Sequence, residues 1–204
     1  MSYPTFFDDA PTIKLYDPLG DFLGAFDNGD TEITYFDCVK LAGHSCPTVA
    51  SAFLIALQGL KELFPDSLPQ RSQIKVTVKK PKDEGVTGVI GNVISYIVGA
   101  NDESGFKGIG GKFARDNLTK FGVSKLLGDI ELTRIDTGAS VIISADTSVV
   151  PGSPDMMPLM QKCMQGTATI EERNKFKSLW QSRVKTMLLQ PELWSKIVTI
   201  NKED

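Results

Sequence analysis

The sequence predicts an α+β fold, with a central antiparallel or mixed sheet and helices packed on it. The expected elements run helix, strand, helix, two strands and two helices, without regular βαβ alternation and without an internal repeat. This order is typical of α+β domains rather than of parallel α/β folds. We expect one domain over residues 1–204, with an irregular lead-in over 1–36 that holds short pieces of structure, and a C-terminal helical extension over 151–204 that forms a helical pair.

The lead-in is acidic and interrupted by Pro and Gly, which argues against long regular elements. Phe22, Leu23 and Phe26 are expected to attach it to the core. The first long helix is predicted over residues 47–63, because Pro47 suits a first helical position and Pro65 ends the pattern. Between the two prolines, apolar residues recur at helical spacing: Val49, Ala50, Phe53, Leu54, Leu57, Leu60 and Phe64.

A strand and a second helix follow. Apolar and polar residues alternate over residues 74–78, as in a half-buried strand. Residues 86–98 carry one apolar stripe of helical period, and Gly99 ends it. Asp83 and Glu84 are expected at the N-terminus of this helix, where the helix dipole favours acidic side chains.

The last third of the chain predicts a hairpin and two helices. Residues 130–135 and 140–145 are expected to be strands joined by a turn that contains Gly138. Thr169 and Glu172 have the spacing of a capping box, which predicts the start of the final helix. The helix before it carries Cys163, which is expected in the core, and four methionines: Met156, Met157, Met160 and Met164.

Composition excludes several classes of protein. The chain has 204 residues, 41% hydrophobic and 23% charged, which is ordinary for a folded globular protein. The net charge of −3 gives no electrostatic reason to bind nucleic acid or an anionic membrane. No segment reaches the about 18 apolar residues of a membrane span. Asp8 and Asp9 do not suit a secretory signal, so we expect a cytoplasmic protein with reduced thiols.

The only histidine, His44, lies two residues before Cys46, in the segment Gly43-His44-Ser45-Cys46-Pro47 that opens the first long helix. Imidazole nitrogen and thiolate sulfur are ligands that zinc and similar transition metals prefer. A helix N-terminus also stabilises a thiolate. The alternative is a buried structural cysteine beside a capping histidine, since the pattern is short.

Residues 41–47 and the small residues that follow them resemble the signature of the FmdE-like family, which is named after a component of formylmethanofuran dehydrogenase. That family carries the motif H-G-H-x-C-P-G at the start of its first long helix. Here the second His, the Cys and the Pro match as His44, Cys46 and Pro47, whereas Ala42 and Thr48 replace the first His and the last Gly. The resemblance extends more weakly over residues 36–125.

The resemblance implies a metal, with zinc the first candidate, at His44 and Cys46, and it implies a homodimer. Two departures limit what it implies. The family often has a cysteine before its second helix, where this chain has Lys82, Asp83, Glu84 and Gly85, and some members end in a cysteine-rich zinc finger, which this chain lacks. The resemblance does not imply methanofuran chemistry.

A metal site needs further ligands. Cys38 lies six residues before His44 and could turn inward, although a small buried cysteine is the commoner outcome. Asp83 or Glu84 could supply a carboxylate, although simple capping is favoured.

The glycine-rich loop from Gly108 to Lys112, with Lys107 and Arg115 beside it, could bind an anion. It lacks both phosphate-loop motifs, however, and a solvated loop with positive φ angles is favoured.

Three functions follow from these residues. The first is a metal-binding protein, with zinc or another divalent transition metal and an open position for water or substrate if it is an enzyme; Cys46 could alternatively be a catalytic thiolate nucleophile. The second is an accessory or metal-carrier module that docks on a larger redox enzyme. The third is a haem-binding protein with His44 and Cys46 as axial ligands, without covalent attachment because C-x-x-C-H is absent.

Overall fold

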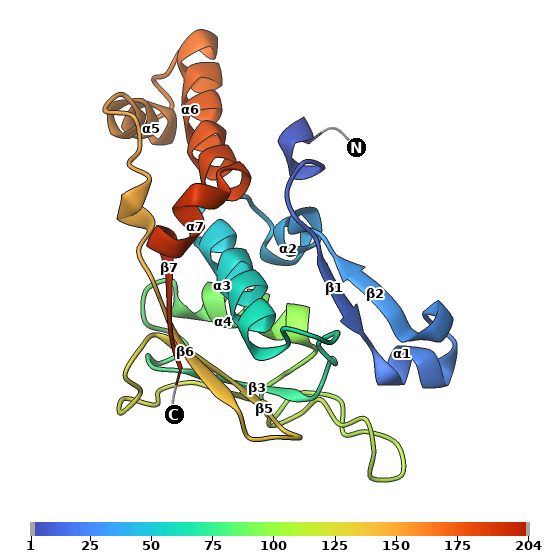
Figure 1. Ribbon diagram of the computed structural model, residues 1–204. Coiled ribbons are helices and arrows are strands. Elements are labelled where there is room, and N and C mark those ends of the chain that lie inside the picture. Colours follow the sequence, from blue (N-terminus) through green and yellow to red (C-terminus); the bar gives the residue numbers. More distant parts are fainter. Residues whose placement is uncertain (1–2, 203–204) are drawn as a thin grey trace.

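The computed structural model describes residues 3–202. Its α-helices are α1 (Pro18–Leu23), α2 (Tyr35–Ala42), α3 (Pro47–Leu63), α4 (Thr87–Val98), α5 (Met156–Met164), α6 (Ile170–Leu189) and α7 (Pro191–Ile197). The strands are β1 (Ile13–Tyr16), β2 (Asp30–Ile33), β3 (Ile74–Val78), β4 (Thr119–Lys120), β5 (Ile130–Arg134), β6 (Ser140–Ala145) and β7 (Val198–Lys202). The predicted α+β class is confirmed: helices pack on a central sheet (Figure 1).

The central sheet of the described chain has the strand order β4-β3-β5-β6-β7. It is mixed, because the short β4 runs parallel to β3 while every other neighbouring pair is antiparallel. β5 and β6 form the predicted hairpin, in which Ile130 lies opposite Ile143. Gly138 takes a φ of 76° in its turn, a conformation that glycine adopts without steric strain.

Helix α3 begins at Pro47 and ends at Leu63, as predicted. It is buried on most of its circumference, because it packs against α4 and α6 as well as strands β5, β6 and β7. Gly59 faces the sheet: a Cβ atom there would lie 2.6 Å from Cδ1 of Ile143 and 2.8 Å from Cδ1 of Leu132. This glycine therefore sets how closely the helix approaches the sheet.

Helix α4 confirms the predicted second helix, with one difference at its start. Val86 is the N-cap residue, and the helix runs from Thr87 to a left-handed Gly99. Asp83 and Glu84 lie in the turn before the helix rather than in its first turn, and both are exposed. The acidic residues thus precede the helix without capping it.

The N-terminal segment is more regular than the irregular lead-in predicted for residues 1–36, of which residues 1 and 2 lie outside the described part. β1 and β2 form an antiparallel pair with Ile13 opposite Ile33, and α1 lies between them in the chain. These strands have four residues each, too few for a clear alternation. Phe22 and Leu23 were expected to attach this segment to the core, but they are 61% and 60% exposed.

The C-terminal segment is not only a helical extension. α5 and α6 form the predicted pair, and the capping box of Thr169 and Glu172 starts α6 as expected. Beyond them, α7 leads into β7, which pairs with β6 and so completes the edge of the central sheet. Cys163 is half-buried on α5 rather than a core residue, and Met164 is 80% exposed. No helix within residues 3–202 is both long and apolar enough to cross a membrane.

Candidate functional site

The His44-Ser45-Cys46 segment is the turn between α2 and α3. A capping box between Thr34 and Asp37 fixes the start of α2, and a left-handed Gly43 ends that helix. α3 then begins immediately after Cys46, its N-cap residue. Both ends of the turn are therefore set by helix boundaries, and the helix start after Cys46 is the one that the sequence predicted.

Ser45 links this turn to α2 and α6. Its hydroxyl donates to Gln181 Oε1 at 2.9 Å and therefore accepts from the Tyr35 hydroxyl, 3.0 Å away. Burial raises the pKa of Tyr35 well above its ordinary value, so that this phenol stays protonated and can donate. The indole Nε1 of Trp180 donates to the Ser45 carbonyl at 2.9 Å. Side chains from α2 and α6 thus fix the residue between the two predicted ligands.

His44 is exposed, and a backbone carbonyl two residues earlier in the chain orients its ring. Nδ1 lies 2.9 Å from the carbonyl oxygen of Ala42. A carbonyl can only accept, so this bond requires the proton on Nδ1 and leaves the Nε2 lone pair of the neutral imidazole available. A histidine that ligates a metal commonly donates its other ring N–H to a backbone carbonyl in this way.

Cys46 lies at the N-terminus of α3 and is buried, with 7% of its surface exposed. Its Sγ accepts a hydrogen bond from the Val49 N–H at 3.4 Å. The sulfur is therefore the N-cap acceptor of α3, a structural role at a position where cysteine ligands and nucleophiles also occur.

The predicted donors do not form a group of metal-ligand size. Within residues 3–202, no three His, Cys, Asp or Glu side chains lie close enough together to hold a metal ion. Cys38 is fully buried, and burial together with the nearby Asp37 carboxylate raises the pKa of its thiol to about 12. Glu84 forms an ion pair with Lys80 at 2.8 Å instead. A ligand role for Cys38 would need a thiolate that its surroundings disfavour.

Glu84 does share a pocket with the first turn of α3. Thr48, two residues after Cys46, and Glu84 both line a pocket of about 430 Å³, whose aliphatic lining residues include Ile55, Val78 and Ile130. Neither His44 nor Cys46 lines it. The haem alternative therefore gains no support from this pocket.

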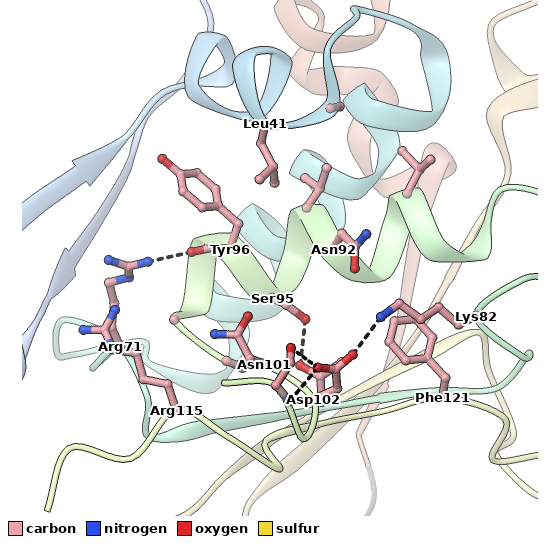
Figure 2. A pocket seen from close by; sticks show the side chains of 17 residues that line it. Leu41, Arg71, Lys82, Asn92, Ser95, Tyr96, Asn101, Asp102, Arg115 and Phe121 are labelled. Carbon is pink, nitrogen blue, oxygen red and sulfur yellow. Dashed lines mark hydrogen bonds and ion pairs between the residues drawn. The ribbon is translucent and has the colours of Figure 1, made fainter. Parts of the chain in front are cut away.

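A larger pocket lies along α4, and we call it the α4 pocket (Figure 2). Its volume is about 620 Å³, within the range of small-molecule sites. The last turn of α2, the loop that follows α4, and residues beside β3 and β4 complete its walls. Its charged lining residues are Arg71, Lys82, Asp102 and Arg115, and its aromatic ones are Tyr96 and Phe121.

Asp17 organises one end of the α4 pocket. Its carboxylate lies 2.9 Å from Arg71 Nη1 and 2.7 Å from Arg115 Nη2, and it also caps α1 through the Gly20 N–H. Burial alone would raise the pKa of Asp17, but the Gly20 N–H and the Arg115 and Arg71 guanidiniums outweigh burial and hold that pKa below its ordinary value. Neither Asp17 nor Arg71 was predicted from the sequence, because they lie 54 residues apart and share no motif.

The glycine-rich loop is a tight turn, as the favoured interpretation held. Ile109 and Lys112 exchange backbone hydrogen bonds of 2.8 and 3.0 Å, while Gly110 and Gly111 take positive φ angles of 55° and 79°. Among the cations considered for an anion site, Arg115 reaches the α4 pocket, whereas the lysines of this loop do not line it. One of them, Lys107, pairs with Asp116.

Comparison with known proteins assigns no family. No protein-family model matches the chain, and no curated protein sequence matches it significantly. The resemblance to the FmdE-like family therefore stays a prediction that depends on the residues around His44 and Cys46.

Proposed function

We propose that the chain binds a divalent transition metal, with zinc the first candidate, through His44 Nε2 and Cys46 Sγ. One observation carries the proposal. Nδ1 of His44 lies 2.9 Å from the Ala42 carbonyl, which selects the tautomer whose Nε2 can bind a metal. The hydrogen bonds of Ser45 with Gln181 and Trp180 add support, because they hold the turn between the two donors in one conformation.

Two protein donors fit an open or exchangeable site. Structural zinc sites have four protein ligands and catalytic zinc sites commonly three, whereas the described residues bring no third His, Cys, Asp or Glu to the pair. Water, substrate or a partner would complete the coordination. When bound, such a metal would supply Lewis-acid chemistry. This donor set suits a metal carrier or accessory module of a redox enzyme as well as an enzyme.

Two proposals about context accompany the site. We propose a homodimer, since large apolar side chains of α1 and of the glycine-rich loop are exposed, among them Phe22, Leu23 and Ile109. We also propose a cytoplasmic location, in which thiols stay reduced; Cys38, Cys46 and Cys163 are all free.

Cobalt substitution tests the metal proposal, because thiolate ligation of Co(II) gives a charge-transfer absorption band that carboxylate or water ligation does not. The wild-type protein, purified without a metal-affinity tag and treated with chelator, should develop this band on titration with Co(II). Cys46→Ser should lose it while keeping an oxygen that can cap α3.

His44→Ala should weaken the binding of Co(II), and Cys163→Ser, the matched control, should leave the band unchanged. An unchanged band in Cys46→Ser would contradict the proposal. A haem absorption band in the protein as purified, lost in both His44→Ala and Cys46→Ser, would favour the haem alternative instead.

A further inference from the structure

Charge is unbalanced at one end of the α4 pocket. Arg71 and Arg115 both pair with Asp17, whose side chain is only 1% exposed. Two guanidinium groups therefore share one carboxylate, and one positive charge is left over. At the other end Lys82 lies 2.7 Å from Asp102, so that these two charges cancel. Figure 2 shows the arginine side chains and the Lys82 side chain at opposite ends of the pocket.

The two arginines differ in how their donors are used: Nη2 of Arg115 donates to both Asp17 oxygens, at 2.7 and 2.8 Å. Arg71 is well satisfied: besides Asp17, its Nε donates to the Ile97 carbonyl at 3.2 Å and its Nη2 to the Tyr96 carbonyl at 2.7 Å. By contrast, Nε of Arg115 is buried and has no hydrogen-bonding partner anywhere in residues 3–202. A buried charged donor without an acceptor is costly and rare, and an anion bound against the Arg115 guanidinium would offset that cost electrostatically.

The rest of the α4 pocket can hold more than a bare ion. Leu41, Val89 and Phe121 provide apolar surface along its length. Asn92 and Asn101 also line it, and their side-chain amides can both donate and accept hydrogen bonds. A pocket with apolar walls and a few convergent polar groups is the usual form of a small-molecule site.

We propose that the α4 pocket binds a small organic carboxylate, with the carboxylate group held by Arg115 and the body of the ligand lying on Phe121, Val89 and Leu41. A singly charged head matches the single positive charge in excess, whereas a phosphate dianion would overcompensate it. Nη2 of Arg115 already donates to both Asp17 oxygens, which leaves Nη1 to donate to a ligand carboxylate. This site is separate from the proposed metal site, and the two can fail independently.

The first test needs no variant. The wild-type protein is titrated with three carboxylates (benzoate, 3-phenylpropionate and hexanoate) and with the neutral amide of each, and binding is measured by calorimetry. At least one acid should bind about tenfold or more tightly than its amide, because the guanidinium recognises the charge. The proposal is overturned if no acid is preferred over its amide. Phenyl phosphate binding more tightly than benzoate would overturn the carboxylate assignment.

The second test locates the binding. Arg115→Gln should abolish the preference for the acid, while Asp17 keeps its pairing with Arg71. Lys107→Gln is the matched control: it removes a cation from the same loop, outside the α4 pocket, and should leave the preference intact. In the wild-type protein, the Nε–H resonance that disappears in Arg115→Gln should shift when the preferred acid is added and stay in place with the amide. An unshifted Nε–H resonance, or a preference that survives Arg115→Gln, would overturn the role of Arg115.

Discussion

Trp180 on α6 donates a hydrogen bond from its indole to the backbone carbonyl of Ser45, 135 residues earlier in the chain, at 2.9 Å. The bond connects α6 to the turn that carries His44 and Cys46. Since Gln181 also accepts from the Ser45 hydroxyl, α6 fixes both the backbone and the side chain of the turn. The C-terminal extension is therefore part of the candidate site, although it contributes no ligand.

Trp180→Phe should weaken metal binding without removing a ligand. The substitution keeps an aromatic ring and deletes the N–H, which should lower the free energy of unfolding by about 1 kcal/mol. Metal affinity should also fall, because the turn loses one of its restraints. Urea unfolding and Co(II) titration measure the two effects.

Trp194→Phe is the matched control. It deletes an indole N–H that donates to the Met187 carbonyl at 3.0 Å, away from the Ser45 turn. We expect a comparable loss of stability and an unchanged affinity for Co(II). Equal effects of the two substitutions on Co(II) affinity would show that Trp180 acts through general stability alone.

Asp17→Asn should be among the most destabilising single substitutions in the chain. It removes the one carboxylate that Arg71 and Arg115 share, in a position that is 1% exposed. Breaking such a buried pair usually costs roughly 3–5 kcal/mol, because the remaining charges stay buried without a partner. Asp136→Asn, which removes the 53%-exposed partner of Arg134, should cost far less. Urea unfolding at neutral pH compares them, and equal losses would contradict the prediction.

The same carboxylate predicts a pH dependence of stability. The pKa of Asp17 is lower in the folded protein than its ordinary value of 3.8, so its contribution is fully present above that value. As the pH falls from 3.8 through the lowered pKa, the Asp17 carboxylate becomes protonated and its contribution to the free energy of unfolding is lost. Below pH 3.8, thermal unfolding curves should therefore show a steeper loss of stability in the wild type than in Asp17→Asn. Parallel curves for the two proteins would contradict this assignment.

Local signals made much of the fold predictable. Pro47, the apolar spacing after it and Pro65 delimited α3, and Thr169 with Glu172 marked the start of α6, because each signal acts within a few residues. β7 gave no comparable signal: it is a five-residue strand whose position depends on pairing with β6, more than 50 residues earlier in the chain. Pairing over such a distance is a tertiary property that a short alternation does not encode.

The candidate sites divide in the same way. His44 and Cys46 were recognisable because they are two residues apart at a helix start. Arg115 was noted as a cation, but its partner Asp17 is 98 residues away and Arg71 carries no motif. Cys38, Asp83 and Glu84 have side chains that can bind a metal, but the sequence does not show whether folding brings such donors together. No group of three such donors forms within the described residues.

A homodimer is expected to bury exposed apolar side chains of α1. Phe22 and Leu23 are 61% and 60% exposed, and the Phe22 ring stacks on the half-buried Phe113 with centroids 5.1 Å apart. Sedimentation velocity at high concentration should show a species of twice 22.3 kDa. Phe22→Asp should dissociate it, and Leu127→Asp, at an 84%-exposed position in the loop before β5, should not. A 22.3 kDa species at every concentration would contradict the prediction.

The metal content of the untagged protein tests the central claim most directly. Elemental analysis of the wild type, purified without chelator or affinity tag, should find about one equivalent of a divalent transition metal per chain. Cys46→Ser should retain only a small fraction of it, while Cys163→Ser should retain all of it. Wild-type protein without metal that also fails to take up Zn(II) or Co(II), or full occupancy in Cys46→Ser, would show that His44-Ser45-Cys46 is a structural turn and not a metal site.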